Sequence, residues 1–266
     1  MLPTKVALDN GLKLVEQKLS GKKLLFLAVS GSHVWGLERP DSDIDFRGVY
    51  QEPTINLLQL DKGSDTVEMS VDNYDLQLYE VEKFFRMLCN HNGNMVNLMF
   101  LPIVYVDNNN INWVELGTKF LTKKLRYYYR GYAESQRKRA MSCRGGKALI
   151  YTYREMFCGL YTMKYGNINH NFNQLWEEAK KNKWYNGTML DKFYPNILQE
   201  ITDEDWHRFY NEWEELCIQL DEIAKISPLP DTFDGRNMCS ELLVNLRLLD
   251  LDEKNKEMSS LRNNYS

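Results

Sequence analysis

Residues 30–49 of the chain are SGSHVWGLERPDSDIDFRGV, and the fold can be worked out from this segment outward. The segment begins at the end of Lys23–Ser30, a compact apolar run that is typical of a buried strand. Gly31 comes next and can adopt the backbone angles that a tight turn from strand to helix requires. Ser32 would then begin a short helix, whose N–H groups and dipole favour a phosphate. The sequence therefore predicts a strand, a glycine turn and a helix start suited to a phosphate group.

The same segment contains a pair of closely spaced acids. Asp43 and Asp45 are two residues apart, so on a strand both carboxylates point to one face, with Cα atoms ~6.6 Å apart. Carboxylates placed in this way can hold Mg²⁺ ions ~3.5–4 Å apart, the spacing of two-metal phosphoryl chemistry. Asp41-Ser42-Asp43 after Pro40 could simply be a turn, and a single Asp-x-Asp is common and by itself weak evidence for a metal site. The metal interpretation gains weight from Gly31-Ser32 upstream and from a third acid downstream.

The third acid has to be chosen among Asp72, Asp75, Glu80 and Glu82. Asp75 lies in an alternating segment, on the face opposite Leu76 and Leu78, and faces the open side if these leucines face the core. Asp72 is expected in a turn. Glu80 and Glu82 begin a helix, where the helix dipole is enough to explain them. We therefore expect Asp75 to complete the acidic site.

The chain is expected to fold as an α+β protein in two parts. Residues 1–106 combine a helix over 4–18 with strands over 23–30, 44–50 and 72–79 and a helix from residue 80, which predicts a mixed β-sheet with flanking helices. Asp107-Asn108-Asn109-Asn110 is a polar break, and residues 107–266 are expected to form an all-helical domain. Its expected helices are 123–141, 147–163, 172–181, 203–226 and 237–250, with Thr202 as the N-cap of the fourth. The polar residues from Lys254 onward are expected to fray.

Composition predicts a globular protein of the cytoplasm. The chain has 266 residues, of which 43% are hydrophobic and 26% charged, and the apolar run Leu24–Val29 is far too short to span a bilayer. No signal-peptide core is recognised near the start, so we expect no membrane association. The five cysteines include no Cys-x-x-Cys pair, which argues against a zinc ribbon or a disulfide scaffold.

Positive charge is concentrated in residues 123–154. This segment has ten basic residues and one acid, Glu134, so it carries +9 in a chain whose formal net charge is −4. Such a segment indicates either a local anion site or a solvated helix surface, and the sequence favours neither.

Together these residues resemble the nucleotidyltransferase superfamily of DNA polymerase β, whose signature is Gly-Ser, a spacer and Asp-x-Asp. The chain is more similar still to the branch associated with RNA ligases in RNA-repair operons. That likeness covers most of the chain and is carried by Gly31-Ser32-His33, Gly36-Leu37, Asp41 to Val49, Tyr79 to Phe84, Asn92 to Asn94, Gly131 to Gln136, Gly146 to Ala148 and Leu229 to Asp231.

The resemblance implies a template-independent enzyme that moves a nucleoside monophosphate from a nucleoside triphosphate to an acceptor hydroxyl and releases pyrophosphate. Asp43 and Asp45 would bind two Mg²⁺ ions, with Mn²⁺ as a substitute, and Asp75 would complete the site. Gly31, Ser32 and His33 would hold the triphosphate, although a single histidine such as His33 is more often structural. The implied acceptor is an RNA end, and an RNA ligase is the implied partner in the same pathway.

Candidate residues of the helical domain follow from spacing. Lys147, Tyr151 and Arg154 are spaced i, i+4, i+7 and share a helix face that could bind the nucleotide. The resembled branch usually has a histidine near Tyr151, and an aromatic core contact explains this tyrosine equally well. Candidate acceptor contacts are Gln136, Arg137 and Arg139, for which an exposed helix face is the alternative explanation. Trp206, Tyr210 and Trp213 are expected to be core aromatics.

Two other functions stay open at this point. The acceptor could be a protein hydroxyl, as in toxin-neutralising relatives, or the chain could be a non-catalytic RNA-binding module that keeps the fold. Three converging acids argue against the second function, because they repel RNA unless a cation neutralises them. The sequence indicates neither the preferred nucleotide nor the oligomeric state.

Overall fold

The computed structural model describes residues 2–107 and 111–263, with side chains as far as Lys256. The chain forms two compact units, one of Met1–Leu116 with Asp234–Ser266 and one of Gly117–Phe233. These bounds differ from the expected ranges 1–106 and 107–266. The main difference is the C-terminal segment, which returns to the sheet-containing unit. Of the expected polar break, only Asp107 is described, and it belongs to no helix or strand. Residues 108–110 lie outside the described residues.

The first unit is built on a five-stranded mixed sheet with the strand order β3-β4-β2-β1-β5. Its strands are β1 (Lys23–Ser30), β2 (Ile44–Gln51), β3 (Thr66–Val71), β4 (Tyr74–Glu80) and β5 (Ile103–Val106). Strands β2 and β4 are parallel, and the other neighbouring pairs are antiparallel. The expected α+β class with a mixed sheet is confirmed. The edge strands β3 and β5 were not expected: they are short and mostly half-buried or exposed, so the hydrophobic signal is weak.

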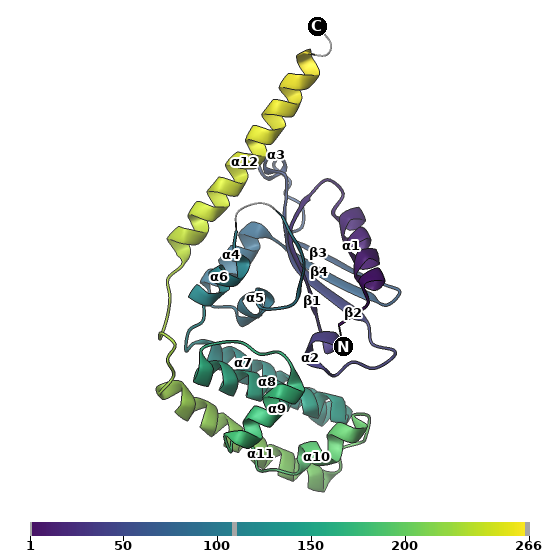
Figure 1. Ribbon diagram of the computed structural model, residues 1–266, viewed down its shortest axis with the longest axis vertical. Helices are drawn as coiled ribbons and strands as arrows, with labels where there is room; N and C mark the ends of the chain where they lie inside the picture. Colours follow the sequence, from purple (N-terminus) through teal and green to yellow (C-terminus); the bar gives the residue numbers. More distant parts are fainter. Residues whose placement is uncertain (1, 108–110, 264–266) are drawn as a thin grey trace. The chain divides into compact units, whose positions relative to one another are not determined.

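Helix α1 covers one face of this sheet, and α4, α5 and α6 lie on the other side (Figure 1). The helices that begin in the first unit are α1 (Lys5–Leu19), α2 (Ser32–Trp35), α3 (Thr54–Leu57), α4 (Val81–Cys89), α5 (Gly93–Leu98), α6 (Trp113–Lys119) and α12 (Arg236–Asn263). On the α1 face, Val15 and Leu19 join a buried cluster with Phe46, Leu76 and Leu78. The opposite face buries Phe26, whose ring centroid is 5.2 Å from that of Trp113, which in turn packs edge-on against Phe84 of α4. This packing fixes which side chains of β2 and β4 point to each face of the sheet, because successive side chains along a strand point to opposite faces.

Asp72 lies in the two-residue turn between β3 and β4, with φ +50°. The expected strand over 72–79 therefore begins two residues late, at Tyr74. Asp72 is confirmed as a turn residue, which removes it as the alternative to Asp75.

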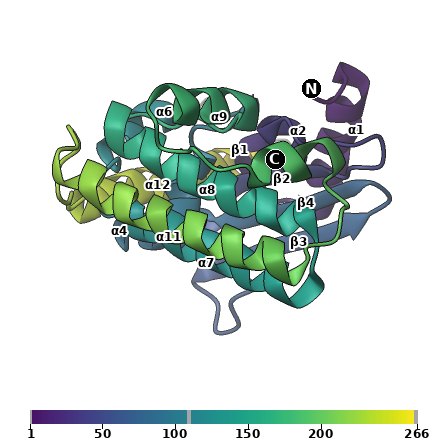
Figure 2. The same ribbon diagram turned by 90° about the horizontal axis from the view of Figure 1, so that it is seen from below.

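The second unit is helical. It contains α7 (Leu125–Cys143), α8 (Gly146–Tyr165), α9 (Phe172–Lys181), α10 (Met189–Phe193), a 3₁₀ turn (Tyr194–Asn196) and α11 (Asp203–Lys225). Helix α8 is buried along most of its length, with α7 and α11 beside it (Figure 2). Thr202 caps α11 as expected, and Asp205 completes a capping box with it.

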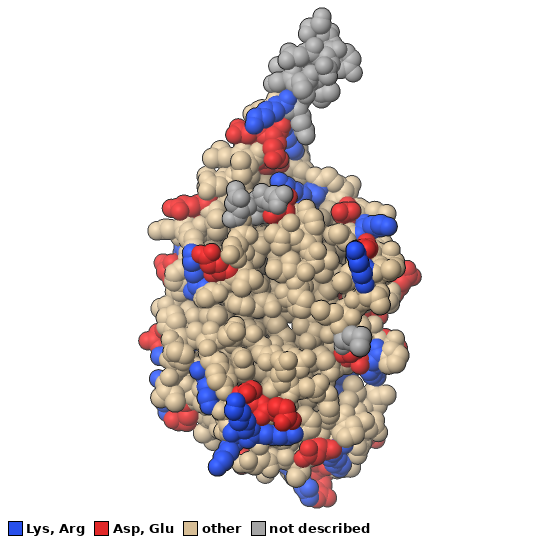
Figure 3. Space-filling model, in the orientation of Figure 1, with Lys and Arg blue, Asp and Glu red and all other residues tan. Residues whose placement is uncertain are grey.

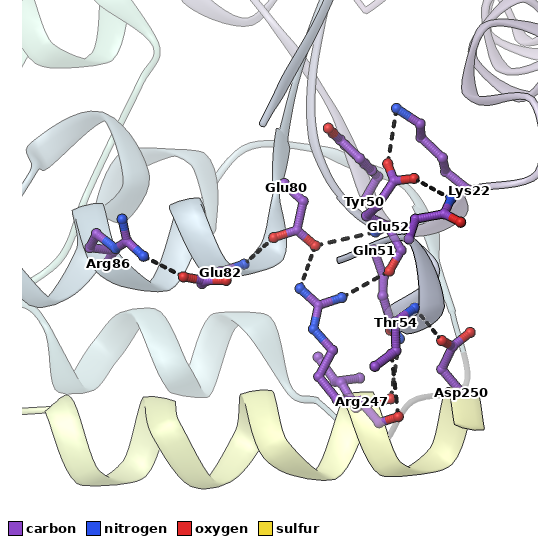
Figure 4. A network of polar contacts seen from close by, with 12 residues as sticks. Lys22, Tyr50, Gln51, Glu52, Thr54, Glu80, Glu82, Arg86, Arg247 and Asp250 are labelled. Carbon is purple, nitrogen blue, oxygen red and sulfur yellow. Dashed lines mark hydrogen bonds and ion pairs between the residues drawn. The ribbon is translucent and has the colours of Figure 1, made fainter. Parts of the chain in front are cut away.

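Helix α12 ends far beyond the expected limit of residue 250. The expectation that the chain frays from Lys254 is wrong for the backbone, which stays helical through Asn263. Its first half is tied to the sheet by a polar network (Figure 4). Gln51 Nε2 donates to the Leu246 carbonyl at 3.1 Å, and Thr54 N donates to Asp250 Oδ2 at 2.6 Å. These contacts explain why the C-terminal segment belongs to the first unit. Among the described helices, none has both the length and the apolar character needed to cross a membrane.

Candidate active site

Two of the three predicted acids meet on the face of the sheet opposite α1. Asp45 of β2 is directly paired with Asp75 of β4 in the parallel ladder. Leu76 and Leu78 are buried against α1, so Asp75 faces the other side of the sheet, as the alternation predicted. The side chains of Asp45 and Asp75 are 25% and 42% exposed, which leaves both carboxylates open to solvent in part.

Asp45 lies against the backbone of Gly31. Gly31 follows β1 with φ +71° and ψ −159°, a combination that is essentially restricted to glycine. A Cβ atom added to Gly31 would stand only 1.8 Å from Asp45 Oδ2. The glycine turn and the acidic motif are therefore parts of one site, in which the missing side chain makes room for the carboxylate.

A Gly31→Ala substitution is expected to lower the free energy of unfolding by ~2 kcal/mol, because it adds a clash with Asp45 to the strain of the backbone angle. Gly21 is a matched control, since it has φ +86° but no atom within 4 Å of an added Cβ. Gly21→Ala should cost ~1 kcal/mol, from backbone strain alone. Urea denaturation of both variants measures the difference, and equal losses would contradict the close approach of Asp45 to Gly31.

Burial and neighbouring charges act on Asp45 in opposite directions. Burial raises the pKa of the Asp45 carboxyl, the Arg47 guanidinium lowers it, and the carboxylates of Asp75 and Asp43 raise it again. The overall pKa is raised. The charges of the two other predicted acids, Asp75 and Asp43, therefore both act on the Asp45 carboxyl.

Asp43 is exposed and comes directly before β2. The loop that leads to it is held by Ser42, whose Oγ accepts from Arg39 N at 2.9 Å. The Ser42 carbonyl lies 3.4 Å from His33 Nε2, and the His33 charge also lowers the pKa of Asp45. His33 thus contacts the acidic loop from the helix that follows Gly31, while the neighbouring Ser32 is buried.

Sequence reasoning assigned no role to Arg47. Its Nη2 lies 3.0 Å from Asp75 Oδ2 and 3.3 Å from Asp45 Oδ1, so one guanidinium contacts both acids. The signal was available in the sequence, because Arg47 is two residues after Asp45 and shares its strand face. What could not be predicted was that β4 would lie beside β2 with Asp75 in reach.

The donor set fits a divalent cation. Carboxylate oxygens are the ligands that Mg²⁺ prefers, and a positive group of this chain already lies between Asp45 and Asp75. Within the described residues, no three His, Cys, Asp or Glu side chains are already arranged around one metal position. A metal site here would therefore require the acids to close and Arg47 to move.

The helical unit presents the other predicted residues. Lys147 and Tyr151 contact each other on α8, with Lys147 Nζ 5.7 Å from the centroid of the Tyr151 ring. Arg154 follows on the same helix but is only 5% exposed and forms an ion pair with Glu155. The three residues therefore lie on one helix, as their spacing predicted. The guanidinium of Arg154, however, is already paired with the buried carboxylate of Glu155.

Acids of its own unit neutralise part of the basic segment. Its ion pairs include Lys123 with Asp231, Arg126 and Arg130 with Asp221, Arg137 and Lys138 with Glu134, Arg144 with Asp203, and Arg154 with Glu155. In the lower part of Figure 3, basic and acidic side chains accordingly lie next to one another. The local count of +9 thus overstates the free positive charge.

Among the candidate acceptor contacts, Arg139 is exposed, Gln136 is half-buried and Arg137 is enclosed. The Arg137 guanidinium binds Glu134 through two nitrogens, and its central carbon lies 4.6 Å from the Trp213 ring centroid and 5.3 Å from that of Tyr210. The expectation that the aromatic residues of α11 lie in the core is wrong: Trp206 and Trp213 are half-buried and Tyr210 is exposed, and all three pack against Arg137.

Comparison with known proteins supports the superfamily. Residues 5–188 match the family model RlaP, described as the RNA repair pathway DNA polymerase beta family. A curated relative, the uncharacterised protein YcgL of Bacillus subtilis (strain 168), is 29% identical over 97 residues, which are 36% of this chain and 37% of YcgL. The matched segment thus spans little more than a third of that relative.

Two solved structures are also similar. One is spectinomycin adenyltransferase AAD(9) from Enterococcus faecialis with ATP and spectinomycin, with 12% identity and a TM-score of 0.49 over 82% of this chain and 100% of that chain. The other is a nucleotidyltransferase-like protein from Exiguobacterium sibiricum 255-15, with 11% identity and a TM-score of 0.28 over 82% of this chain and 74% of that chain.

Proposed function

Since the chain belongs to the RNA repair pathway DNA polymerase beta family, we propose that it is a template-independent nucleotidyltransferase that transfers a nucleoside monophosphate from a nucleoside triphosphate to the hydroxyl of an RNA end. The observation that carries the proposal is the pairing of Asp45 with Asp75 on the face of the sheet opposite α1, with Asp45 against Gly31.

Each candidate site residue of the first unit has a role in this proposal. Asp43, Asp45 and Asp75 hold Mg²⁺ or Mn²⁺, which when bound supplies positive charge for the triphosphate and for the attacking hydroxyl. The Gly31-Ser32 turn and His33 orient the phosphates beside these acids. The hydroxyl oxygen attacks the α-phosphorus and its proton passes to solvent water, while the bond from the α-phosphorus to the α,β-bridging oxygen breaks and pyrophosphate leaves.

We also propose binding roles for residues of the helical unit. Lys147 and Tyr151 are proposed to bind the nucleotide, and Arg154 can join them only if its ion pair with Glu155 opens. Gln136, Arg137 and Arg139 are proposed to contact the acceptor, where exposed Arg139 requires the least rearrangement. An RNA ligase is the proposed partner, since a ligase joins the ends that such an enzyme would prepare. The proposal places the protein in the cytoplasm.

A transfer assay tests this function. The protein is incubated with each of four α-³²P-labelled nucleoside triphosphates, Mg²⁺ and RNAs with different ends. Label should appear on the RNA, and nuclease should release it. Label that resists nuclease and stays with polypeptide would instead identify a protein acceptor. RNA binding that EDTA leaves unchanged, without transfer of any of the four labels, would overturn the enzymatic proposal in favour of an RNA-binding module.

A further inference from the structure

Arg47 is placed where a metal ion of the proposed site would have to act. Its Nη2 contacts one oxygen of Asp45 and one of Asp75, at 3.3 and 3.0 Å. Its Nη1 donates to two backbone carbonyls, those of Phe46 at 2.9 Å and Asp75 at 3.4 Å. One half of the guanidinium is thus bound to the backbone, and the other half to the two carboxylates.

The contact is neither fully buried nor free in solvent. The side chain of Arg47 is 26% exposed, close to the 25% of Asp45, so this pair is screened less than a surface ion pair. The two carboxylates belong to directly paired residues of β2 and β4, so their negative charges repel each other, and in this structure Arg47 is the cation that contacts both.

A divalent ion and the guanidinium need the same oxygens. Asp45 Oδ1 and Asp75 Oδ2 accept from Nη2, and a metal ion bound to them would bring two further positive charges into contact with the guanidinium. At such distances the repulsion between like charges is strong, even with the screening of a partly exposed site. Metal ion and Nη2 cannot therefore occupy the same place together.

We propose that Arg47 is a built-in counter-cation that competes with the divalent metal ion for Asp45 and Asp75. The inference rests on the proposed function, because it assigns the metal to these acids. The Nη1 contacts with the two carbonyls involve no carboxylate, so they can persist while Nη2 leaves. A triphosphate would offer the displaced nitrogen new anionic oxygens, since guanidinium groups bind phosphates well. Arg47 would thereby make metal uptake depend on the arrival of the nucleotide.

The test measures binding of Mn²⁺ alone, without nucleotide or RNA, from the loss of the electron paramagnetic resonance signal of free Mn²⁺. The variant Arg47→Gln removes the positive charge but keeps a polar side chain. Its dissociation constant for Mn²⁺ should be roughly tenfold lower than that of the wild type, because Mn²⁺ no longer has to displace Arg47 from the two carboxylates. The size of this effect follows from the Coulomb attraction between Arg47 and the carboxylates, reduced by solvent screening. An unchanged or higher dissociation constant would overturn the proposal, because Arg47 would then only hold the acids in position.

Arg39→Gln is the matched control. Arg39 carries the same charge in the adjoining loop but pairs with Asp41 at 2.8 Å. The control should leave Mn²⁺ affinity within about twofold of the wild type, since exposed and separated charges are screened. If Arg39→Gln tightened binding as much as Arg47→Gln, the general loss of charge would explain the effect and the proposal would fail.

Two further variants keep the test decisive. Should Arg47→Gln not fold, Arg47→Met replaces it: methionine keeps an unbranched side chain but has no charge, so Mn²⁺ binding should still tighten, and no change would overturn the proposal. Asp45→Asn separates this inference from the proposed function. If Asp45→Asn abolishes Mn²⁺ binding while loss of Arg47 does not tighten it, only the role of Arg47 is refuted. If Asp45→Asn leaves binding unchanged, the proposed metal site itself is refuted.

Discussion

Asp45→Asn is expected to reduce nucleotidyl transfer by at least ~10³-fold at saturating nucleotide and metal, since it removes one of the charges that stabilise the transition state. Asparagine keeps the size of the side chain, so the close contact with Gly31 is preserved. The measurement is the initial rate of label transfer in the assay described above. A rate within tenfold of the wild type would show that Asp45 does not serve the reaction.

The loss of activity should not come from unfolding. Burial raises the pKa of Asp45, which means that the folded protein disfavours the charged form. A neutral amide at this position should therefore leave the urea midpoint close to that of the wild type. Asp41→Asn is the control for charge: Asp41 is 71% exposed and pairs with Arg39, and its loss should change the transfer rate by less than about threefold.

The sequence predicted the parts of this site that depend on local pattern. The alternation of Asp75 with Leu76 and Leu78 was enough to place the carboxylate opposite the core, and Gly31 was recognised as a turn at the end of β1. The role of Arg47 depends on the parallel pairing of β2 with β4, which joins residues 28 positions apart. No local pattern specifies such a pairing.

The same limit explains the differences in the rest of the chain. The count of +9 in residues 123–154 ignored acids distant in sequence, such as Asp221, which lies 91 residues beyond Arg130 and pairs with it at 2.9 Å. Helix α12 was assigned to the helical domain because it follows other helices, whereas its partners are on the strands of the first unit. The position of a helix in the chain says little about where the helix packs when its anchoring contacts join residues 167 to 196 positions apart.

Arg247→Met is expected to lower the free energy of unfolding by ~3 kcal/mol, because it leaves Glu80 buried without its positive partner. Arg247 Nη2 donates to Glu80 Oε1 at 2.7 Å, and Nη1 donates to the Glu52 carbonyl at 2.9 Å. The two side chains are 13% and 6% exposed. A single residue of α12 thus binds the ends of both parallel strands, as Figure 4 shows, and those strands carry Asp45 and Asp75.

The effect should be specific to the buried pair. Arg86 and Glu82 form an ion pair in the same view, but their side chains are 71% and 43% exposed, so Arg86→Gln should cost less than ~0.5 kcal/mol. Glu80 also accepts from the backbone nitrogens of Glu52 and Glu82, so Glu80→Gln alone should be destabilising as well.

A double-mutant cycle decides whether the two charges act on each other. If they do, Arg247→Met with Glu80→Gln together should cost at least ~1 kcal/mol less than the sum of the single losses, since the double variant has no unpaired buried charge. Urea denaturation of the four proteins gives all the free energies needed. Additive losses would mean that Arg247 stabilises α12 through packing and the Glu52 carbonyl, and that the charge of Glu80 is held by its two backbone donors instead.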